Sequence, residues 1–99
     1  MRISIQGDEF IQKNISSEKI PEICDRFNQM EKHFLGFIIS EKGWEVWIDC
    51  SGNRQIYILG DTITVTGLIT RKYKVSAYDI NEFVKFLEPL EGDAYENKN

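Results

Sequence analysis

The feature that most constrains this fold is a change in the spacing of apolar residues near position 35. From Leu35 onward, apolar residues alternate with polar ones, which is the period of a strand with one buried face. Turn residues interrupt this alternation at 41–43, 51–53, 60–61 and 67. Upstream, the apolar residues recur every three or four positions, as on one helix face: Ile20, Ile23, Cys24, Phe27, Met30 and Phe34. We therefore predict a helix over about 17–32 and then a meander of strands.

Shorter patterns predict the remaining elements. Residues 2–6 alternate and predict a first strand. The meander is expected to hold strands at about 35–40, 44–50, 54–59, 62–66 and 68–76, and a bulge at Gly67 would merge the last two. Ser16 or Ser17 is expected to cap the first helix. Asp79, followed three residues later by Glu82, predicts the start of a second helix, which Pro89 ends.

These elements predict an α+β fold: an antiparallel sheet of about five strands in the order strand, helix, meander, helix, with both helices packed on one face. Residues 1–90 are expected to form one domain, and 91–99 an acidic flexible tail.

Composition narrows the class of protein. Sixteen acidic residues against twelve basic ones give a net charge of −4, which disfavours binding to phosphate backbones and favours a basic partner. No apolar run approaches the length of a membrane span, and the N-terminal residues turn acidic at Asp8, so a cytoplasmic protein without a membrane association is expected. Cys24 and Cys50 are expected to be reduced and buried.

The chain shows no recognisable catalytic motif. His33 is the only histidine, and its position predicts a cap on the negative end of the first helix. Glu45 and Asp49 form a carboxylate pair, but such pairs on a strand are common. We expect no enzymatic activity, no catalytic residues, no cofactor and no metal.

The strand predicted at 44–50 carries the main candidate site. Alternation places Trp44, Val46, Ile48 and Cys50 on the core face, and Glu45, Trp47 and Asp49 on the other. Tyr57 on the next strand is expected beside Trp47. A surface tryptophan between carboxylates is typical of a protein interface, although a loop, the tail or a helix could instead cover it.

The leading hypothesis is a small acidic inhibitor or immunity-type protein that neutralises a basic toxin or nuclease by covering its active cleft. Its partner-binding residues would be Glu45, Trp47, Asp49, Tyr57 and, in the acidic second helix, Asp79 and Glu82.

Two alternatives remain. The sheet aromatics near Arg71, Lys72 and Lys74 could bind single-stranded nucleic acid, against the overall charge. The chain could also be a small oligomeric subunit, a homodimer that pairs through an edge strand at 62–66 or 35–40.

Overall fold

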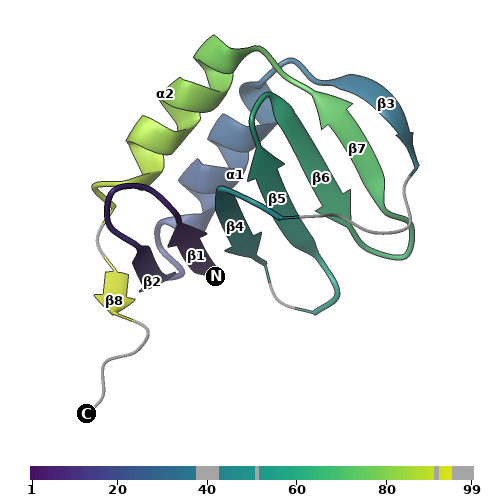
Figure 1. The fold of residues 1–99 in the computed structure, drawn as a ribbon. Helices are drawn as coiled ribbons and strands as arrows, with labels where there is room; N and C mark the ends of the chain where they lie inside the picture. The colour runs from purple at the N-terminus through teal and green to yellow at the C-terminus, as the bar shows by residue number, and fades with distance from the viewer. Residues whose placement is uncertain (38–42, 51, 91, 95–99) are drawn as a thin grey trace.

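The centre of the fold is an antiparallel sheet (Figure 1), in a computed structural model that describes residues 1–37, 43–50, 52–90 and 92–94. Its strands lie in the order β3-β7-β6-β5-β4-β1-β2-β8, in which β8 is a short addition to a seven-stranded sheet. The strands are β1 (Arg2–Ile5), β2 (Ile11–Ile15), β3 (His33–Phe37), β4 (Val46–Asp49), β5 (Gln55–Leu59), β6 (Thr62–Thr66), β7 (Arg71–Lys74) and β8 (Gly92–Ala94).

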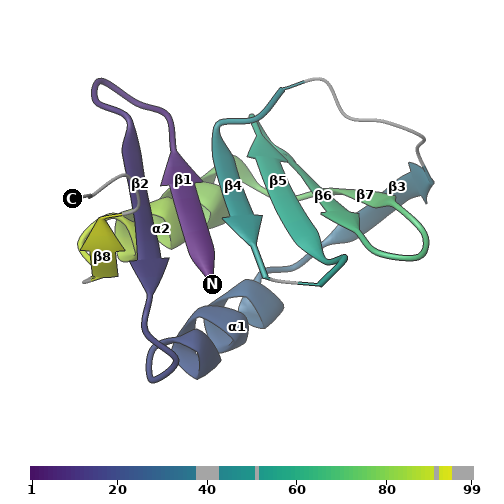
Figure 2. The ribbon, with the colours of Figure 1, turned by 90° about the horizontal axis from the view of Figure 1, so that it is seen from below.

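Two short helices, α1 (Ile20–Gln29) and α2 (Ala77–Leu87), lie on the same side of the sheet (Figure 2). Their apolar stripes pack against strand residues that point to that side. The core comprises Ile3, Ile5, Ile15, Ile23, Met30, Val46, Ile48, Ile56, Ile58, Ile63, Val75, Ile80, Phe83 and Leu87. The α+β class and the two helices on one face thus agree with the sequence-based prediction.

The predicted strand count and order are wrong. The prediction omits strand β2, which pairs with β1. On the side of the helices β2 carries Lys13 between Ile11 and Ile15, and this charged residue interrupts the apolar alternation that would indicate a strand. Lys13 is nevertheless buried, because its ammonium group donates to carbonyl oxygens at the end of α2.

The strand at 62–66 has the predicted bounds, but three other predictions differ from the structure. Residues 62–66 form β6, which lies inside the sheet between β5 and β7 and is not an edge. Gly67 lies in the connection between β6 and β7, whereas the bulge is in β3, between Phe34 and Gly36. Residues 92–94, predicted as part of a tail, pair with β2; residues 38–40, 91 and 95–99 lie outside the described part of the chain.

The helix ends are set by different residues from those predicted. The N-cap of α1 is Lys19, which makes no side-chain cap, rather than Ser16 or Ser17. The N-cap of α2 is Ser76, whose hydroxyl accepts from the N–H of Asp79 at 3.1 Å, so Asp79 lies in the first turn. The second helix therefore begins with a preferred capping serine three residues before the predicted cap, whereas the first begins two residues after the predicted serines.

The first helix ends at Gln29, and His33 begins β3 instead of capping the helix. The His33 side chain is exposed, with Nε2 3.7 Å from the Glu31 carboxylate. Lys32 takes the capping role, because its Nζ donates to the carbonyls of Phe27 and Met30 at 2.7 and 3.0 Å.

Candidate interaction surfaces

The side of the sheet away from the helices, here called the open face, brings together three of the six predicted binding residues, Trp47, Asp49 and Tyr57. Strand pairing places Ser4, Trp47, Tyr57 and Thr64 in one row across β1, β4, β5 and β6. The Trp47 and Tyr57 rings stack with their centroids 6.0 Å apart. Glu45 and Asp49 flank Trp47 on the chain, and Trp47 points away from the helical layer, as the alternation predicts.

The aromatic row continues beyond the strands. The ring of Trp44 lies 5.5 Å from that of Trp47, and Phe10 lies 6.5 Å from Trp44. Trp44 was predicted to face the core with Val46, and this prediction is wrong because Trp44 precedes β4, where strand alternation no longer applies. The open face thus carries four connected rings.

Polar groups on the open face are engaged within the molecule. Asp49 Oδ2 lies 3.3 Å from Arg2 Nη2, and the Arg2 guanidinium lies 5.9 Å from the centre of the Trp47 ring. Glu45, which precedes β4, instead lines a pocket with residues of α2, and its Oε1 accepts a hydrogen bond from the N–H of Gly60 at 2.9 Å. The carboxylates of Asp49 and Glu45, two of the four predicted to meet a basic partner, are therefore engaged within the molecule.

Tyr57 and Trp47 are partly covered. The Tyr57 hydroxyl donates to Gln55 Oε1, and burial, with a smaller contribution from Asp49, raises the pKa of Tyr57. Trp47 is half-buried, and its indole N–H is buried with no hydrogen-bond partner in the described part of the chain. The ring of Trp47 therefore packs within a surface cluster and does not project freely.

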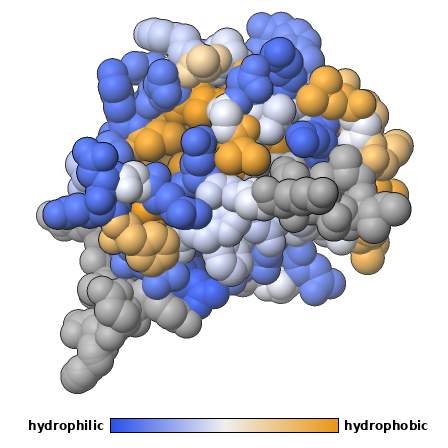
Figure 3. Space-filling view, in the orientation of Figure 1, coloured by the Kyte–Doolittle hydropathy of each residue, from blue (hydrophilic) through white to orange (hydrophobic). Residues whose placement is uncertain are grey.

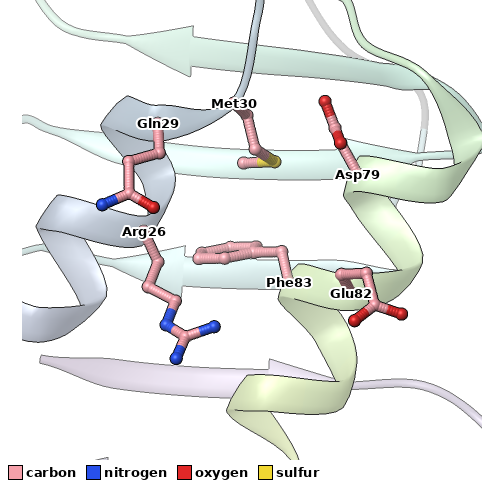
Figure 4. A pocket seen from close by; sticks show the side chains of 6 residues that line it. All are labelled: Arg26, Gln29, Met30, Asp79, Glu82 and Phe83. Atoms are coloured by element: carbon pink, nitrogen blue, oxygen red, sulfur yellow. The ribbon is translucent and has the colours of Figure 1, made fainter.

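The two predicted residues in the second helix also lie away from the open face. Asp79 and Glu82 belong to α2 and line a groove of about 190 Å³ between the two helices (Figure 4). Arg26 of α1 lines the same groove but pairs with Glu22 at 4.0 Å, and Glu82 Oε2 lies 3.6 Å from Lys85 Nζ. Because the helices lie on the opposite side of the sheet from Trp47, these carboxylates form no single surface with the open face.

A surface that the sequence reasoning missed lies at the β3 end of the sheet, on the side of the helices. One row of paired residues on that side runs from β1 to β3: Ile3, Ile48, Ile56, Val65, Arg71 and Phe37. Ile3 is completely buried, whereas Phe37 is 66% exposed. The helices therefore cover the β1 end of the row and leave the β3 end bare.

The neighbouring row repeats this gradient. It contains Ile5, Val46, Ile58, Ile63, Tyr73 and Phe34. Its first four members are buried, Tyr73 is half-buried and Phe34 is 52% exposed. Figures 1 and 2 both show β7 and β3 extending beyond the two helices.

The bare surface is apolar and hollowed. The Phe34 ring contacts Phe37 and Tyr73 at centroid distances of 5.1 and 5.7 Å. Leu68 and Ile69, in the β6–β7 connection, are 100% and 59% exposed and line the same groove of about 640 Å³. We call these five residues, Phe34, Phe37, Leu68, Ile69 and Tyr73, the uncovered end; Figure 3 shows hydrophobic side chains along this border of the molecule.

The charged residues that line this groove are basic. Arg54 and Arg71 contribute to its wall, and no acidic residue does so within the described ranges. Neither arginine forms an ion pair with another described residue. The uncovered end is thus an apolar hollow with an arginine rim.

One sequence signal could have indicated this surface. Leu68 and Ile69 are large apolar residues directly after a turn glycine, where polar residues are usual. The spacing of apolar residues predicts Phe34 on the stripe of the first helix, but Phe34 lies in β3 beside Phe37. Only the strand pairing shows that these residues share one side of the sheet.

The structure also bears on the predicted chemistry of the thiols. Cys24 is exposed on α1, so its predicted burial is wrong, whereas Cys50 is half-buried and both are free thiols. Burial raises the pKa of Cys50, with a smaller effect from Cys24, and both residues line the same pocket between α1 and the sheet.

Across the described residues, no three histidine, cysteine, aspartate or glutamate side chains are placed to hold a metal ion.

Neither helix, within the ranges that the structure describes, is long and apolar enough to cross a membrane. Searches against protein-family models, curated proteins and solved structures find no match to this chain.

Proposed function

We propose that this chain is a protein-binding module without catalytic activity, and that its main contact surface is the uncovered end. The observation that supports the proposal is the gradient of burial along the two strand rows, from fully buried isoleucines to phenylalanines more than half exposed. A sheet face that is mostly apolar but covered only in part has an unfilled place in its helical layer.

The energetics favour a partner at this place. Covering a large apolar side chain stabilises a complex by roughly 1.5–3 kcal/mol when its whole surface leaves water. Phe37, Leu68 and Ile69 offer most of their surface for this purpose. Contiguous apolar patches of this kind on a small protein are characteristic of interaction sites.

The experiment is in-cell cross-linking followed by mass spectrometry, with the wild type and a Phe37→Asp/Leu68→Asp double variant. Tyr78→Asp is the matched control, because Tyr78 is an equally exposed ring, 70% accessible, on α2. We expect a defined protein partner with the wild type and the control, and loss of that partner with the double variant. Equal recovery from all three proteins, or no defined partner, would refute the proposal.

A second candidate keeps the more specific function of an acidic inhibitor that covers the basic cleft of a toxin or nuclease. The observation in its favour is the Phe10 end of the aromatic row, where an exposed ring follows the exposed acidic residues Asp8 and Glu9. In such a complex the carboxylates would take the place of nucleic-acid phosphates, and the rings would supply desolvated contact area.

The two candidates are separable by mutation. Asp8→Asn/Glu9→Gln/Phe10→Ala should slow association with a basic partner and reduce its dependence on salt, while leaving binding at the uncovered end unchanged. A partner whose association is insensitive to this triple variant does not use the Phe10 end of the open face.

Binding of single-stranded nucleic acid has weaker support. The Trp47 and Tyr57 rings stack on each other, so their facing sides cannot stack on bases. A filter-binding assay with mixed oligonucleotides tests this alternative, and protein binding alone predicts no retention.

A further inference from the structure

We infer that the uncovered end accepts an acidic amphipathic helix of another protein, which docks beside α1 as a third helix of the layer. This inference rests on the proposed protein-binding function and adds the shape and charge of the partner segment.

The arrangement of the layers favours a helix. The sheet residues beneath the vacant place belong to the same two rows that α1 and α2 cover on the other strands. Phe34, Phe37 and Tyr73 project to the side of the helices and leave a groove of about 640 Å³. A helix with an apolar stripe would fill this groove as α1 and α2 fill theirs.

The form of β3 disfavours an added strand. β3 is at the end of the strand order, but its register shifts between Phe34 and Gly36. Gly36 adopts φ +151°, a conformation that residues with a side chain rarely adopt. A bulge on an edge strand interrupts the regular row of N–H and C=O groups that a pairing strand needs.

The charge of the rim indicates an acidic partner. Arg54 and Arg71 line the groove without a carboxylate among the described lining residues. Glutamates beside the apolar stripe of a docked helix could pair with both guanidinium groups. A second copy of this chain, joined through β3, would bring two further arginines to the groove and no carboxylate from its described lining residues, which disfavours a homodimer here.

The test is selection from displayed peptide libraries at pH 7. One library holds helical peptides of about four turns with a leucine stripe and random glutamate or lysine beside it. A second holds extended peptides with alternating apolar residues. We expect helical, glutamate-rich peptides from the wild type, binding at least about tenfold weaker to Phe37→Asp, and unchanged binding to Tyr78→Asp.

An Arg54→Glu/Arg71→Glu variant, checked for native circular dichroism, should reverse the selection toward lysine. Selection of extended peptides, or of helical peptides without a preference between glutamate and lysine, would overturn this inference. If the selected peptides no longer bind Phe37→Asp, the proposed protein-binding function would still hold. Selected peptides that bind Phe37→Asp as well as the wild type would remove both proposals. A dimer at pH 7 that Phe37→Asp dissociates would identify a second copy as the occupant and also overturn the inference.

Discussion

Lys13 shows how a single residue can conceal a strand and yet hold the fold together. Its side chain is only 7% exposed, and Nζ donates to the carbonyls of Leu87, Glu88 and Leu90 at 3.0, 2.8 and 2.7 Å. Burial lowers the pKa of Lys13, partly offset by the Glu88 carboxylate. The ammonium thus joins β2 to the end of α2, where helix carbonyls lack internal partners.

Replacing Lys13 with methionine should lower the free energy of unfolding by about 1–3 kcal/mol, because three carbonyls lose a charged donor at a buried site. Urea unfolding followed by circular dichroism measures this change. Lys85→Met is the control: Lys85 is exposed on α2, so the expected change is within about 0.5 kcal/mol. Equal midpoints for the two variants would show that Lys13 has no special role.

Trp47 carries a second prediction at this scale. Its ring packs against Trp44 and Tyr57, so Trp47→Ala should lower the free energy of unfolding by roughly 1–3 kcal/mol. Trp47→Phe should lower it less, because it keeps a ring and removes a buried N–H without a described partner. Thermal unfolding of both variants is the measurement. A fully tolerated Trp47→Ala would restore the view of Trp47 as a free contact residue.

At the scale of elements, the sheet is wider across its strands than two short helices can cover. α1 and α2 span 10 and 11 residues, or about 15–17 Å each, whereas eight strands about 4.8 Å apart extend roughly 34 Å. Two helices packed about 10 Å apart cannot cover this width. The apolar side chains of β3 and β7 are left without a covering element.

Substitutions at this end should therefore affect solubility more than stability. Phe37→Ser/Leu68→Ser is expected to change the free energy of unfolding by less than about 1 kcal/mol, since both side chains already contact water in the folded state. The variant should also bind less of an environment-sensitive apolar dye. A large loss of stability would show that these residues are covered in solution.

At the scale of the whole molecule, net charge works against the exposed apolar end. The net charge is −4 at pH 7 and vanishes near pH 5.0. Mutual repulsion between molecules therefore weakens as carboxylates protonate, while the uncovered end keeps its apolar surface.

Light scattering between pH 7.5 and 5 should accordingly show increasing self-association as the pH falls. Phe37→Ser/Leu68→Ser should shift the onset to lower pH without changing the net charge. Identical onsets in the wild type and the variant would mean that charge alone, and not the uncovered end, controls association.

Local spacing was enough to predict several features. The period of three and four residues placed Ile23 and Phe27 on the inner stripe of a helix, and the period of two placed Trp47 opposite Val46 and Ile48. These features follow from the geometry of a single helix or strand, in which side-chain direction depends only on position along the chain.

Only the tertiary structure decided four features. These are the strand order, the burial of Lys13, the separation of Asp79 and Glu82 from Trp47, and the bare end at Phe34 and Phe37. Each depends on which distant segments pack together and on how far two helices reach across the sheet. The spacing of apolar residues along the chain does not predict how much of the sheet the helices cover, because this coverage results from contacts between residues far apart in the chain.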